Sequence, residues 1–490
     1  MDSPDTIPFQ SFIQIDRKSN TAIYLQIVTQ MINAIQRQYL YKGMKLPGTR
    51  VLSKILNVNR NTLVLVYEEL ASLGWIEIIP NKGTFILAKE ENVVNRIKNT
   101  TPVRYTTYPN STGFRFKKSM ILDSPFETPT YSFILNDGIP DLRLLPIQPL
   151  AKLYSTSLKR KKNIDWAFHE SKDFFKSHLS NFLNLTRGLH ITKKNMLVAR
   201  SIETCLYISS EILISPGDKV IVGELSYFLP NMIFQKAGAQ LLTIPIDKEG
   251  ILIEPLKHLC KKNKIRMLYL TPHHHYPTTV TLSAERRIAL LELSTQYGFI
   301  ILEDDYDYDF NYTNSRTLPL ASADKDGMVV YIGSFGRSLA PGFRSGFIIA
   351  PQNLIHEMNK LLGIIDRQGD VFMDLSLGEM IEEGEIYRHL KKSTYIYKER
   401  RNSLTHLLSH HFKNEIRFTP PSGGLATWIE WNFPINLMQI RENCKKENIF
   451  IPKSLLYQSK KVTALRMGFG NFSTNELEMI VEKLKFCTCK

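Results

Sequence analysis

Five short apolar runs, separated by intervals long enough for helices, constrain the fold of residues 131–490 more than any other feature of the chain. Runs that lack a polar alternation are typical of strands buried on both faces of a mostly parallel sheet. The intervals have room for the helices that cover such a sheet, so the sequence predicts the α/β class. The runs are at 219–222, 266–270, 299–302, 328–332 and 347–349.

The first ninety residues show a different pattern. Apolar side chains recur there at helical spacing, and two strand-like runs follow on either side of a Pro-Asn-Lys turn. Three helices followed by a hairpin predict a winged helix-turn-helix. The helices are expected at 21–38, 51–56 and 60–73, and the strands at 75–79 and 83–87.

A winged helix-turn-helix places the start of its third helix against the major groove of DNA. The residues expected there are Arg60, Asn61 and Thr62, while Arg50 and Lys82 are expected to contact phosphates, Lys82 from the wing. The alternative is a small structural domain whose Arg60 is merely exposed. Net charge does not decide between them. The chain carries +15, but its first ninety residues hold ten Lys and Arg against seven Asp and Glu.

A length of 490 residues implies more than one domain. Residues 91–130 lack sustained periodicity and are rich in Asn, Thr, Ser and Pro, which predicts an extended linker. The predicted organisation is therefore a DNA-binding domain over 1–90, a linker over 91–130 and an α/β domain over 131–490. A smaller C-terminal subdomain is expected from about residue 385.

Several features point to the cytoplasm. The first residues lack the basic and apolar regions of a signal peptide, and no apolar stretch has the length of a membrane helix. Five cysteines are few and odd in number, which suits a reducing compartment. No metal site is expected. Three consecutive histidines, His273 to His275, would point to alternate faces if they extended a strand.

The segment at 331–349 consists of a strand, a turn of small residues and a second strand, with Arg337 in the turn. It resembles the cofactor-lysine segment of fold-type I aminotransferases, in the form found in MocR-type regulators of the GntR family. The resemblance implies pyridoxal phosphate as cofactor and places Arg337 at the position of the Schiff-base lysine. A guanidinium stays protonated and offers no nucleophilic amine. Covalent attachment and a catalytic residue are therefore not expected.

The resemblance extends over both parts of the chain. The first part shares the GntR pattern Leu-Pro-x-x-Arg at 46–50 and Asn-Val-Asn-Arg-Asn-Thr-Leu at 57–63. In the second part, the resemblance implies that Arg466 holds a ligand carboxylate, a bidentate role that suits guanidinium. It further implies a vestigial or noncovalent cofactor site. The residues of that site are Asp304 at the ring nitrogen, Tyr306 at the phenolic oxygen, Tyr227 against the ring, Arg344 at the phosphate, Ser334 and Arg337.

Other positions depart from the family pattern. The family's phosphate-binding loop is rich in small residues and amides, but the aligned stretch here reads Ser-Ile-Glu-Thr at 201–204. An isoleucine and a carboxylate are unfavourable neighbours for a phosphate dianion. The glycine of the Pro-Thr-Gly turn is Thr279. Several departures around one cofactor indicate a degenerate active site.

The favoured interpretation is a one-component transcription regulator. Its winged helix binds a double-stranded operator, and its aminotransferase-like domain forms a homodimer, with the heads possibly swapped, and senses a small carboxylated effector. Arg337 then holds a second anionic group or pairs with Asp304. Two alternatives stay open. One is a regulator that binds pyridoxal or pyridoxamine phosphate noncovalently, and the other is an active aminotransferase, which would need a different lysine.

Overall fold

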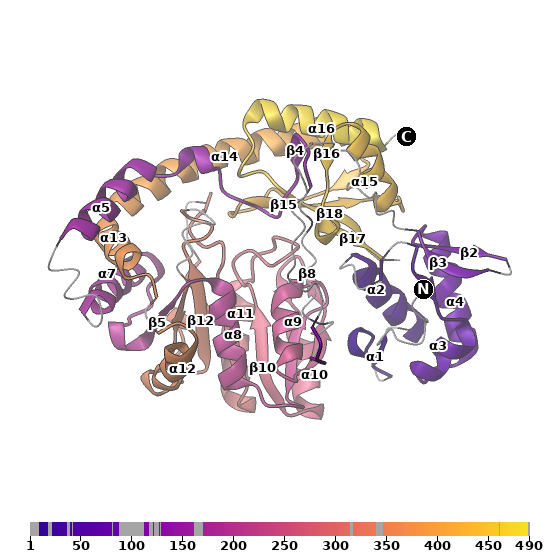
Figure 1. Cartoon of the computed structure of the whole chain (residues 1–490), viewed down its shortest axis with the longest axis horizontal. Coiled ribbons are helices and arrows are strands. Elements are labelled where there is room, and N and C mark those ends of the chain that lie inside the picture. The colour runs from indigo at the N-terminus through magenta and orange to yellow at the C-terminus, as the bar shows by residue number, and fades with distance from the viewer. Residues whose placement is uncertain are drawn as a thin grey trace. The chain divides into compact units, whose positions relative to one another are not determined.

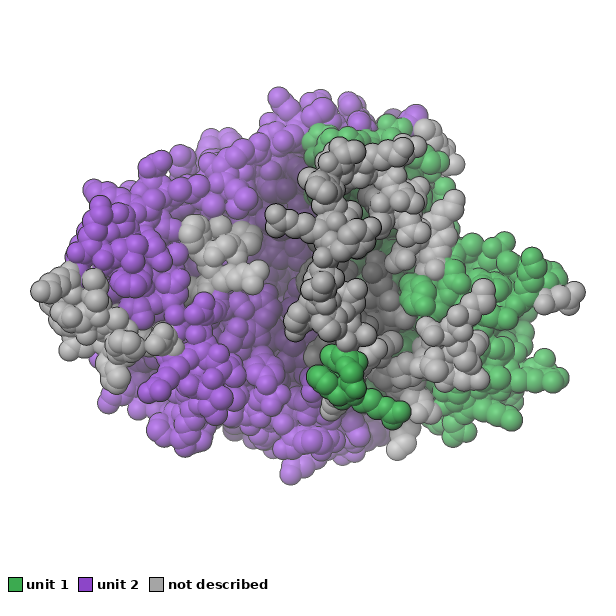
Figure 2. Space-filling model, viewed as in Figure 1, with its two compact units in different colours: residues 1–134, 431–464, 490 green, residues 135–430, 465–489 purple. Residues whose placement is uncertain are grey.

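The computed structural model of the chain forms two compact units (Figure 2). Unit 1 comprises residues 1–134, 431–464 and 490, and unit 2 comprises residues 135–430 and 465–489. The structure describes residues 9–17, 22–36, 40–41, 43–80, 82–87, 112–116, 121, 127, 129–160, 170–313, 317–339, 346–367, 369–459 and 461–488.

The N-terminal part of unit 1 contains the predicted three helices and hairpin. The helices are α2 (Ile23–Gln36), α3 (Thr49–Ile55) and α4 (Arg60–Ser72), preceded by the short α1 (Phe9–Phe12). The strands β2 (Ile76–Ile79) and β3 (Gly83–Ile86) pair antiparallel as the hairpin. A strand not predicted from the sequence, β1 (Lys45–Leu46), pairs with β3 and completes a sheet in the order β1-β3-β2.

Local chemistry explains the turn between α3 and α4. Asn57 adopts a left-handed conformation with φ of 51°, which asparagine tolerates better than most residues. The side chain of Asn59 accepts a hydrogen bond from the amide of Asn61 and so caps the N-terminus of α4. The buried hydroxyl of Tyr67 donates to the carbonyl oxygen of Pro47 at 2.6 Å, which fixes α4 against the loop before α3.

The remaining elements of unit 1 come from far apart in the sequence. They are β4 (Phe133–Ile134), α15 (Leu437–Lys446), β16 (Ile449–Phe450), a 3-10 turn η7 (Lys453–Leu455) and β17 (Leu456–Gln458). Strand β4 pairs parallel with β16. Most of the linker predicted for 91–130 lies outside the described residues. Glu127 is described, and its carboxylate accepts a hydrogen bond from the buried Arg441 at 2.6 Å.

Unit 2 is built on a seven-stranded sheet in the order β5-β13-β12-β11-β10-β6-β7 (Figure 1). The five neighbours from β12 to β7 are parallel, and β13 runs antiparallel to both β12 and β5. The predicted mostly parallel sheet is therefore confirmed. Its strands are β5 (Met196–Ala199), β6 (Lys219–Gly223), β7 (Gln240–Ile244), β10 (Ile265–Leu270), β11 (Ile300–Asp304), β12 (Val329–Ser334) and β13 (Gly346–Ile349).

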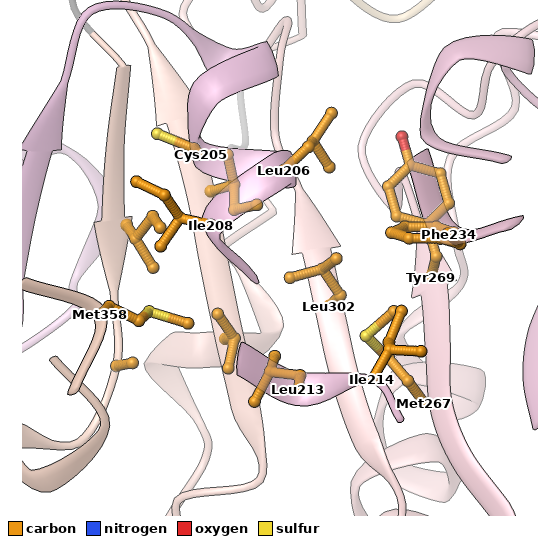
Figure 3. Close-up of a cluster of buried hydrophobic side chains, with 14 of the residues drawn as sticks. Cys205, Leu206, Ile208, Leu213, Ile214, Phe234, Met267, Tyr269, Leu302 and Met358 are labelled. Atoms are coloured by element: carbon orange, nitrogen blue, oxygen red, sulfur yellow. The ribbon is translucent and has the colours of Figure 1, made fainter. Parts of the chain in front are cut away.

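Helices cover both faces of this sheet, which is why its strands are apolar on both sides. On one face lie α8 (Ile202–Leu213), α9 (Phe228–Lys236) and α12 (Gln352–Ile365). Figure 3 shows this core, where Leu206 and Ile208 of α8 pack with Met267 and Leu302 of the sheet. On the other face, α10 (Ile253–Lys262) and α11 (Ala284–Tyr297) pack on a second core that includes Leu268 and Ile301.

A third core surrounds the β5–β13 end of the sheet. It is formed by the helices α5 (Ile147–Lys159), α7 (Glu170–Arg187) and α13 (Val371–Glu382) with Met196, Tyr331 and Phe347. The rest of unit 2 contains the long helix α14 (Glu385–Phe412), which packs with α16 (Thr474–Thr488). Also present are the short strands β8 (Ile246–Asp247), β9 (Gly250–Ile251) and β14 (Ile416–Arg417), and the strands β15 (Ala426–Trp431) and β18 (Thr463–Gly468).

Within the described residues, no helix is long and apolar enough to cross a membrane.

The Asn59 cap provides a test of the winged-helix fold. We expect Asn59→Ala to lower the free energy of unfolding by about 1 kcal/mol, because an amide at the start of α4 loses its acceptor. Asn59→Ser keeps an acceptor and is the matched control. Urea unfolding followed by circular dichroism measures both. Equal stability of the alanine and serine variants would show that the cap contributes nothing.

Candidate functional site

The carboxyl ends of four strands bring the candidate residues of unit 2 together. Asp304 is the last residue of β11 and Ser334 the last residue of β12. Tyr227 follows β6 and precedes the first residue of α9, and Ser201 precedes α8 just after β5. The carboxyl edge of an open α/β sheet is where such folds bind ligands. The fold alone therefore marks this edge as the candidate site.

Asp304 is the most unusual acid at this edge. One carboxylate oxygen, Oδ2, accepts a hydrogen bond from the hydroxyl of Tyr269 at 2.7 Å, whereas Oδ1 is buried without a partner. Burial raises the pKa of Asp304 to about 7. The charges of Asp305 and Glu203 also raise it, whereas the hydrogen bond from Tyr269 and the charge of Arg337 lower it. A buried acceptor without a donor is costly, so Oδ1 is ready to accept a ligand's N–H.

The guanidinium of Arg337 points to an acid that the sequence analysis did not select. Its Nη2 donates to Oδ2 of Asp137 at 2.8 Å, and its Nη1 donates to the carbonyl oxygen of Gly138. The guanidinium also lies over the ring of Tyr306, 5.7 Å from the centroid. Gly138 has φ of +113°, and a Cβ there would come within 3.3 Å of the guanidinium. A glycine therefore permits the close approach of Arg337.

This pairing differs from the pairing with Asp304 that the sequence analysis considered. The guanidinium is bonded to Asp137 and not to Asp304, on which it acts only through its charge. Burial disfavours the charged form of Asp137, but the charges of Arg337 and Arg466 outweigh it and hold its pKa below the ordinary value. The same partnership raises the pKa of Arg337. Both groups are therefore ionised, and they neutralise each other.

Arg466, on β18, makes three hydrogen bonds to residues of unit 2. Its guanidinium donates to the carbonyl oxygen of Pro277 at 2.9 Å, to the hydroxyl of Tyr306 at 3.1 Å and to the carbonyl oxygen of Asp137 at 3.2 Å. It also stacks on the ring of Tyr276 at 4.4 Å, and it is 1% exposed. All of these partners are uncharged groups. The positive charge of Arg466 therefore remains uncompensated by a direct ion pair among the described residues.

The hydroxyl of Tyr306 joins two parts of the site. It donates to the carbonyl oxygen of His274 at 2.8 Å and accepts from Arg466. Tyr227 packs against Tyr276, with ring centroids 4.6 Å apart, and its phenol senses the charges of Asp137, Arg337, Glu203 and Asp304. Burial raises the pKa values of both phenols, so both hydroxyls are protonated near neutral pH. The charges of the site's acids and arginines act on both phenols.

The turn before α8 aligns with the family's phosphate-binding loop, so its contacts test whether a phosphate fits there. The side chain of Ser201 caps its own helix by accepting from the amide of Thr204 at 3.2 Å. Glu203 lies in the first turn of α8, where a carboxylate interacts favourably with the helix dipole. A Cβ on Gly346 would lie 2.6 Å from the carbonyl of Ser201, so β13 closes tightly against this turn. The described residues of this turn do not fit a phosphate dianion.

A buried network supports the strand ends from below. His273 donates or accepts at Nδ1 with Asp305 at 2.9 Å, and Asp305 accepts from the hydroxyl of Tyr331 at 2.8 Å. Arg187 pairs with Asp309 at 3.0 Å and contacts the same tyrosine hydroxyl. These contacts fix the segment after β11. Asp304 takes no part in them.

The histidine triplet does not extend strand β10, as the sequence analysis had assumed, but follows it in a loop. All three side chains are buried. His273 contacts Asp305, and Nε2 of His275 lies 2.8 Å from the carbonyl oxygen of Leu225. Burial lowers the pKa of His274 to about 3 and that of His275 to about 4, so both rings are neutral. Hydrogen bonds within the fold account for His273 and His275.

In unit 1, the residues selected for DNA contact lie on the expected elements. Arg60 and Asn61 are exposed at the start of α4, and Thr62 follows them partly exposed. Arg50 is exposed on α3, and Lys82 is exposed at the hairpin. A further basic residue, Arg17, donates to the carbonyl oxygen of Asn57 in the turn before α4. The sequence analysis did not single it out.

The structure brings together most of the residues selected for the cofactor site. Asp304, Tyr306, Tyr227, Arg337 and Arg466 are linked by hydrogen bonds, ring contacts or electrostatic influence. Ser334 accepts from the amide of Gly336 in the turn that carries Arg337. Arg344 lies outside the described residues. Asp137 and Glu203 were missed as site residues, although Glu203 belongs to the stretch at 201–204 that the sequence analysis aligned with the family's phosphate-binding loop.

Comparisons with known proteins agree with this geometry. The solved structure of an archaeal alanine:glyoxylate aminotransferase matches with a TM-score of 0.67 and 25% identity, covering 73% of this chain and 90% of that chain. Residues 23–86 match the family of bacterial regulatory proteins, gntR family. The fold and the sequence therefore define a GntR-type helix-turn-helix regulator with an aminotransferase-like domain.

Residues 166–484 match the family described as aminotransferase class I and II, and the chain belongs to this family. Two relatives combine both parts. An uncharacterized HTH-type transcriptional regulator, YdeL of Bacillus subtilis strain 168, is 24% identical and covers 98% of this chain and 99% of its own length. The probable rhizopine catabolism regulatory protein MocR of Rhizobium meliloti is 22% identical, covering 84% and 82%. Membership implies a cofactor of the pyridoxal phosphate type.

The raised pKa of Asp304 predicts a pH-dependent stability. Between its ordinary value near 4 and about 7, the folded chain retains a proton that the unfolded chain has lost. The stabilisation is complete below about pH 4 and is lost as the pH rises through 7. Asp304→Asn cannot titrate. We therefore expect its stability relative to wild type to rise by about 2 kcal/mol from about pH 5.5 to pH 8. Urea unfolding at both pH values measures this, and a pH-independent difference would contradict it.

The Arg337–Asp137 ion pair predicts coupled substitutions. Arg337→Met removes the cation that neutralises Asp137 and Asp137→Asn removes the anion that neutralises Arg337, whereas the double variant leaves neither charge unpaired. We expect a coupling energy of about 1–2 kcal/mol in a double-mutant cycle measured by urea unfolding.

The exposed pair of Lys360 and Glu357, whose Nζ and Oε1 atoms are 2.7 Å apart, is the matched control for this cycle. Its side chains are 60% and 54% exposed, so its coupling is expected to be close to zero. Additive effects at Arg337 and Asp137 would mean that the observed contact does not stabilise the site.

Proposed function

We propose that this chain is a one-component transcription regulator whose aminotransferase-like domain senses a small carboxylated ligand without covalent pyridoxal phosphate. The observation that carries the proposal is the position of Arg337. Its guanidinium lies over the ring of Tyr306, and its charge acts on Asp304 at the carboxyl edge of an aminotransferase-like sheet. A guanidinium there cannot form a Schiff base.

The proposed division of labour follows the sequence. Residues 1–90 bind the operator through Arg60, Asn61 and Thr62, with Arg50 and Lys82 on phosphates. Residues 91–130 act as the linker, and residues 131–490 as the effector domain, with a smaller C-terminal subdomain from about residue 385. The exposure of Arg60 and Asn61 at the start of α4 supports the DNA-contacting role. The names of the relatives YdeL and MocR support the regulatory role.

For the ligand, the proposed receptors are the two arginines. Arg466 bonds only to uncharged groups and Arg337 bonds to a carboxylate, so a ligand carboxylate interacts favourably with Arg466 and competes with Asp137 for Arg337. Such competition would release the segment that contains Asp137 and Gly138. A ligand alters DNA binding only if it favours one arrangement of the chain over another, and this exchange of partners provides such a difference.

We further propose a homodimer. Exposed large apolar side chains lie shortly after Asp137 and on the helices α5 and α7, which suits an interface between two copies of the chain. They are Ile139, Leu142, Ile147, Leu158 and Leu185. Light scattering of the full chain would test this, since a monomer at all concentrations would contradict it.

A second candidate is a regulator that binds a vitamer of the cofactor noncovalently. The unpartnered Oδ1 of Asp304 favours it, because that atom is free to accept the N–H of a protonated ring nitrogen. The turn at Ser201 and Glu203 opposes it, because it does not fit the phosphate.

The DNA-binding part of the proposal predicts a selective loss. We expect Arg60→Ala to weaken binding to DNA from upstream of the chain's own gene by about tenfold, as is usual for loss of one base contact. Lys360→Ala removes the same charge from an exposed position on helix α12 and is expected to have no effect.

Fluorescence anisotropy with a labelled duplex at fixed salt measures both variants against wild type. Salt must be held constant because phosphate contacts make the affinity depend on it. Equal losses of DNA affinity in the two variants would mean that Arg60 acts only through the net charge of the chain. Absence of any binding by wild type at low salt would overturn the regulator proposal.

A further inference from the structure

The acids at the carboxyl edge of the sheet outnumber the groups that neutralise them. Asp137 is paired with Arg337, but Asp304, Asp307 and Glu203 have no ion-pair partner among the described residues. Among the described residues, Asp307 accepts only from the amide of Leu425, at 3.3 Å, and its buried Oδ1 has no partner. Arg466 is the one cation of the described site that no carboxylate contacts directly.

Two buried carboxylate oxygens without donors are independent evidence that a hydrogen-bond donor is missing from this site. Asp304 and Asp307 are 4% and 5% exposed. Folded proteins leave few such atoms unsatisfied, because each costs about 1–3 kcal/mol. The pKa of each carboxyl is raised to about 7, chiefly by burial, so near neutral pH a cation that binds can favour the charged form of either.

Glu203, an exposed residue, adds a negative charge to the turn that the resemblance aligns with the family's phosphate-binding loop. It lies in the first turn of α8, and its charge acts on Asp304 and on the phenol of Tyr227. The amide of Thr204 in the same turn is already bonded to Ser201. A phosphate dianion would therefore meet a carboxylate and would find this amide occupied.

We propose that the effector of this site is a phosphate-free ligand with a protonated nitrogen, which donates to Oδ1 of Asp304. The carboxylate of Glu203 repels the phosphate of phosphate esters. It also attracts the protonated nitrogen of the ligand without contacting it. This rests on the proposed sensing function and narrows it, because together with a carboxylate held by the arginines it describes a zwitterion. The described residues of the turn that contains Glu203 therefore do not fit the phosphate of a phosphorylated cofactor.

Two related probes test the charge selection, namely pyridoxamine and pyridoxamine phosphate. They share the protonated nitrogens and differ in the phosphate. We expect titration calorimetry of the full chain near neutral pH to show pyridoxamine binding about tenfold more tightly, the effect of ~1.4 kcal/mol of repulsion. Tighter binding of the phosphate ester, or no binding of either probe, would overturn the proposal.

Variants assign the effect to named residues. Glu203→Gln is expected to bring the two affinities together, and Asp304→Asn is expected to weaken both probes. Glu211→Gln, an exposed acid near the other end of the same helix, is the matched control and should keep the wild-type ratio. An unchanged ratio in Glu203→Gln would contradict the selection by Glu203.

DNA anisotropy on the same protein samples separates this inference from the function on which it rests. If wild type binds its upstream DNA but prefers the phosphate ester, the regulator proposal stands and the present inference fails. If the preference for pyridoxamine is found without DNA binding, the ligand chemistry stands and the regulatory role fails.

Discussion

The ion pair between Arg337 and Asp137 is the interaction on which the candidate site depends. A guanidinium keeps its charge at every accessible pH, so one placed in a partly buried position needs an acceptor. Asp137 supplies it at 2.8 Å, and Gly138 supplies a carbonyl oxygen beside it. The backbone of Asp137 also accepts from Arg466, at 3.2 Å. One short segment thereby holds both arginines of the site.

Under the proposed function, this arrangement accounts for an aminotransferase fold that persists without Schiff-base chemistry. The sheet, its helices on both faces and the buried network below Asp305 remain intact, because they are stabilised by packing and internal hydrogen bonds. At the carboxyl edge, Arg337 and Arg466 bond to Asp137 and Tyr306. Asp304 and Asp307 differ, and their unpartnered oxygens mark where a ligand would still be accommodated.

Much of the fold follows from local patterns that can be read along the chain. The helix α4 begins at Arg60 because Asn59 caps it, and the central strands are apolar because both faces of the sheet are covered. Strands β5 and β7 were not predicted. β7 begins with the exposed Gln240 and contains the exposed Thr243, so it does not form a distinct apolar run. β5 is an apolar run of four residues, as long as the run predicted at 299–302, and was missed.

The site was less predictable, because its contacts join distant positions. Asp304 and Tyr306 were found through a motif, and the structure brings them close to Arg337 and Arg466. The partner of Arg337, however, is 200 positions away in the sequence, and no periodicity or spacing connects the two. The state of Asp304 depends on burial, which a linear pattern does not reveal.

The most direct measurement is borohydride reduction of wild type and Arg337→Lys after incubation with pyridoxal and with pyridoxal phosphate, followed by peptide mass spectrometry. The account predicts no stoichiometric adduct in wild type and an adduct at position 337 in the variant. A stoichiometric adduct on any lysine of wild type would contradict the claim that covalent attachment has been lost. An unmodified variant would contradict the assignment of position 337 to the lysine site.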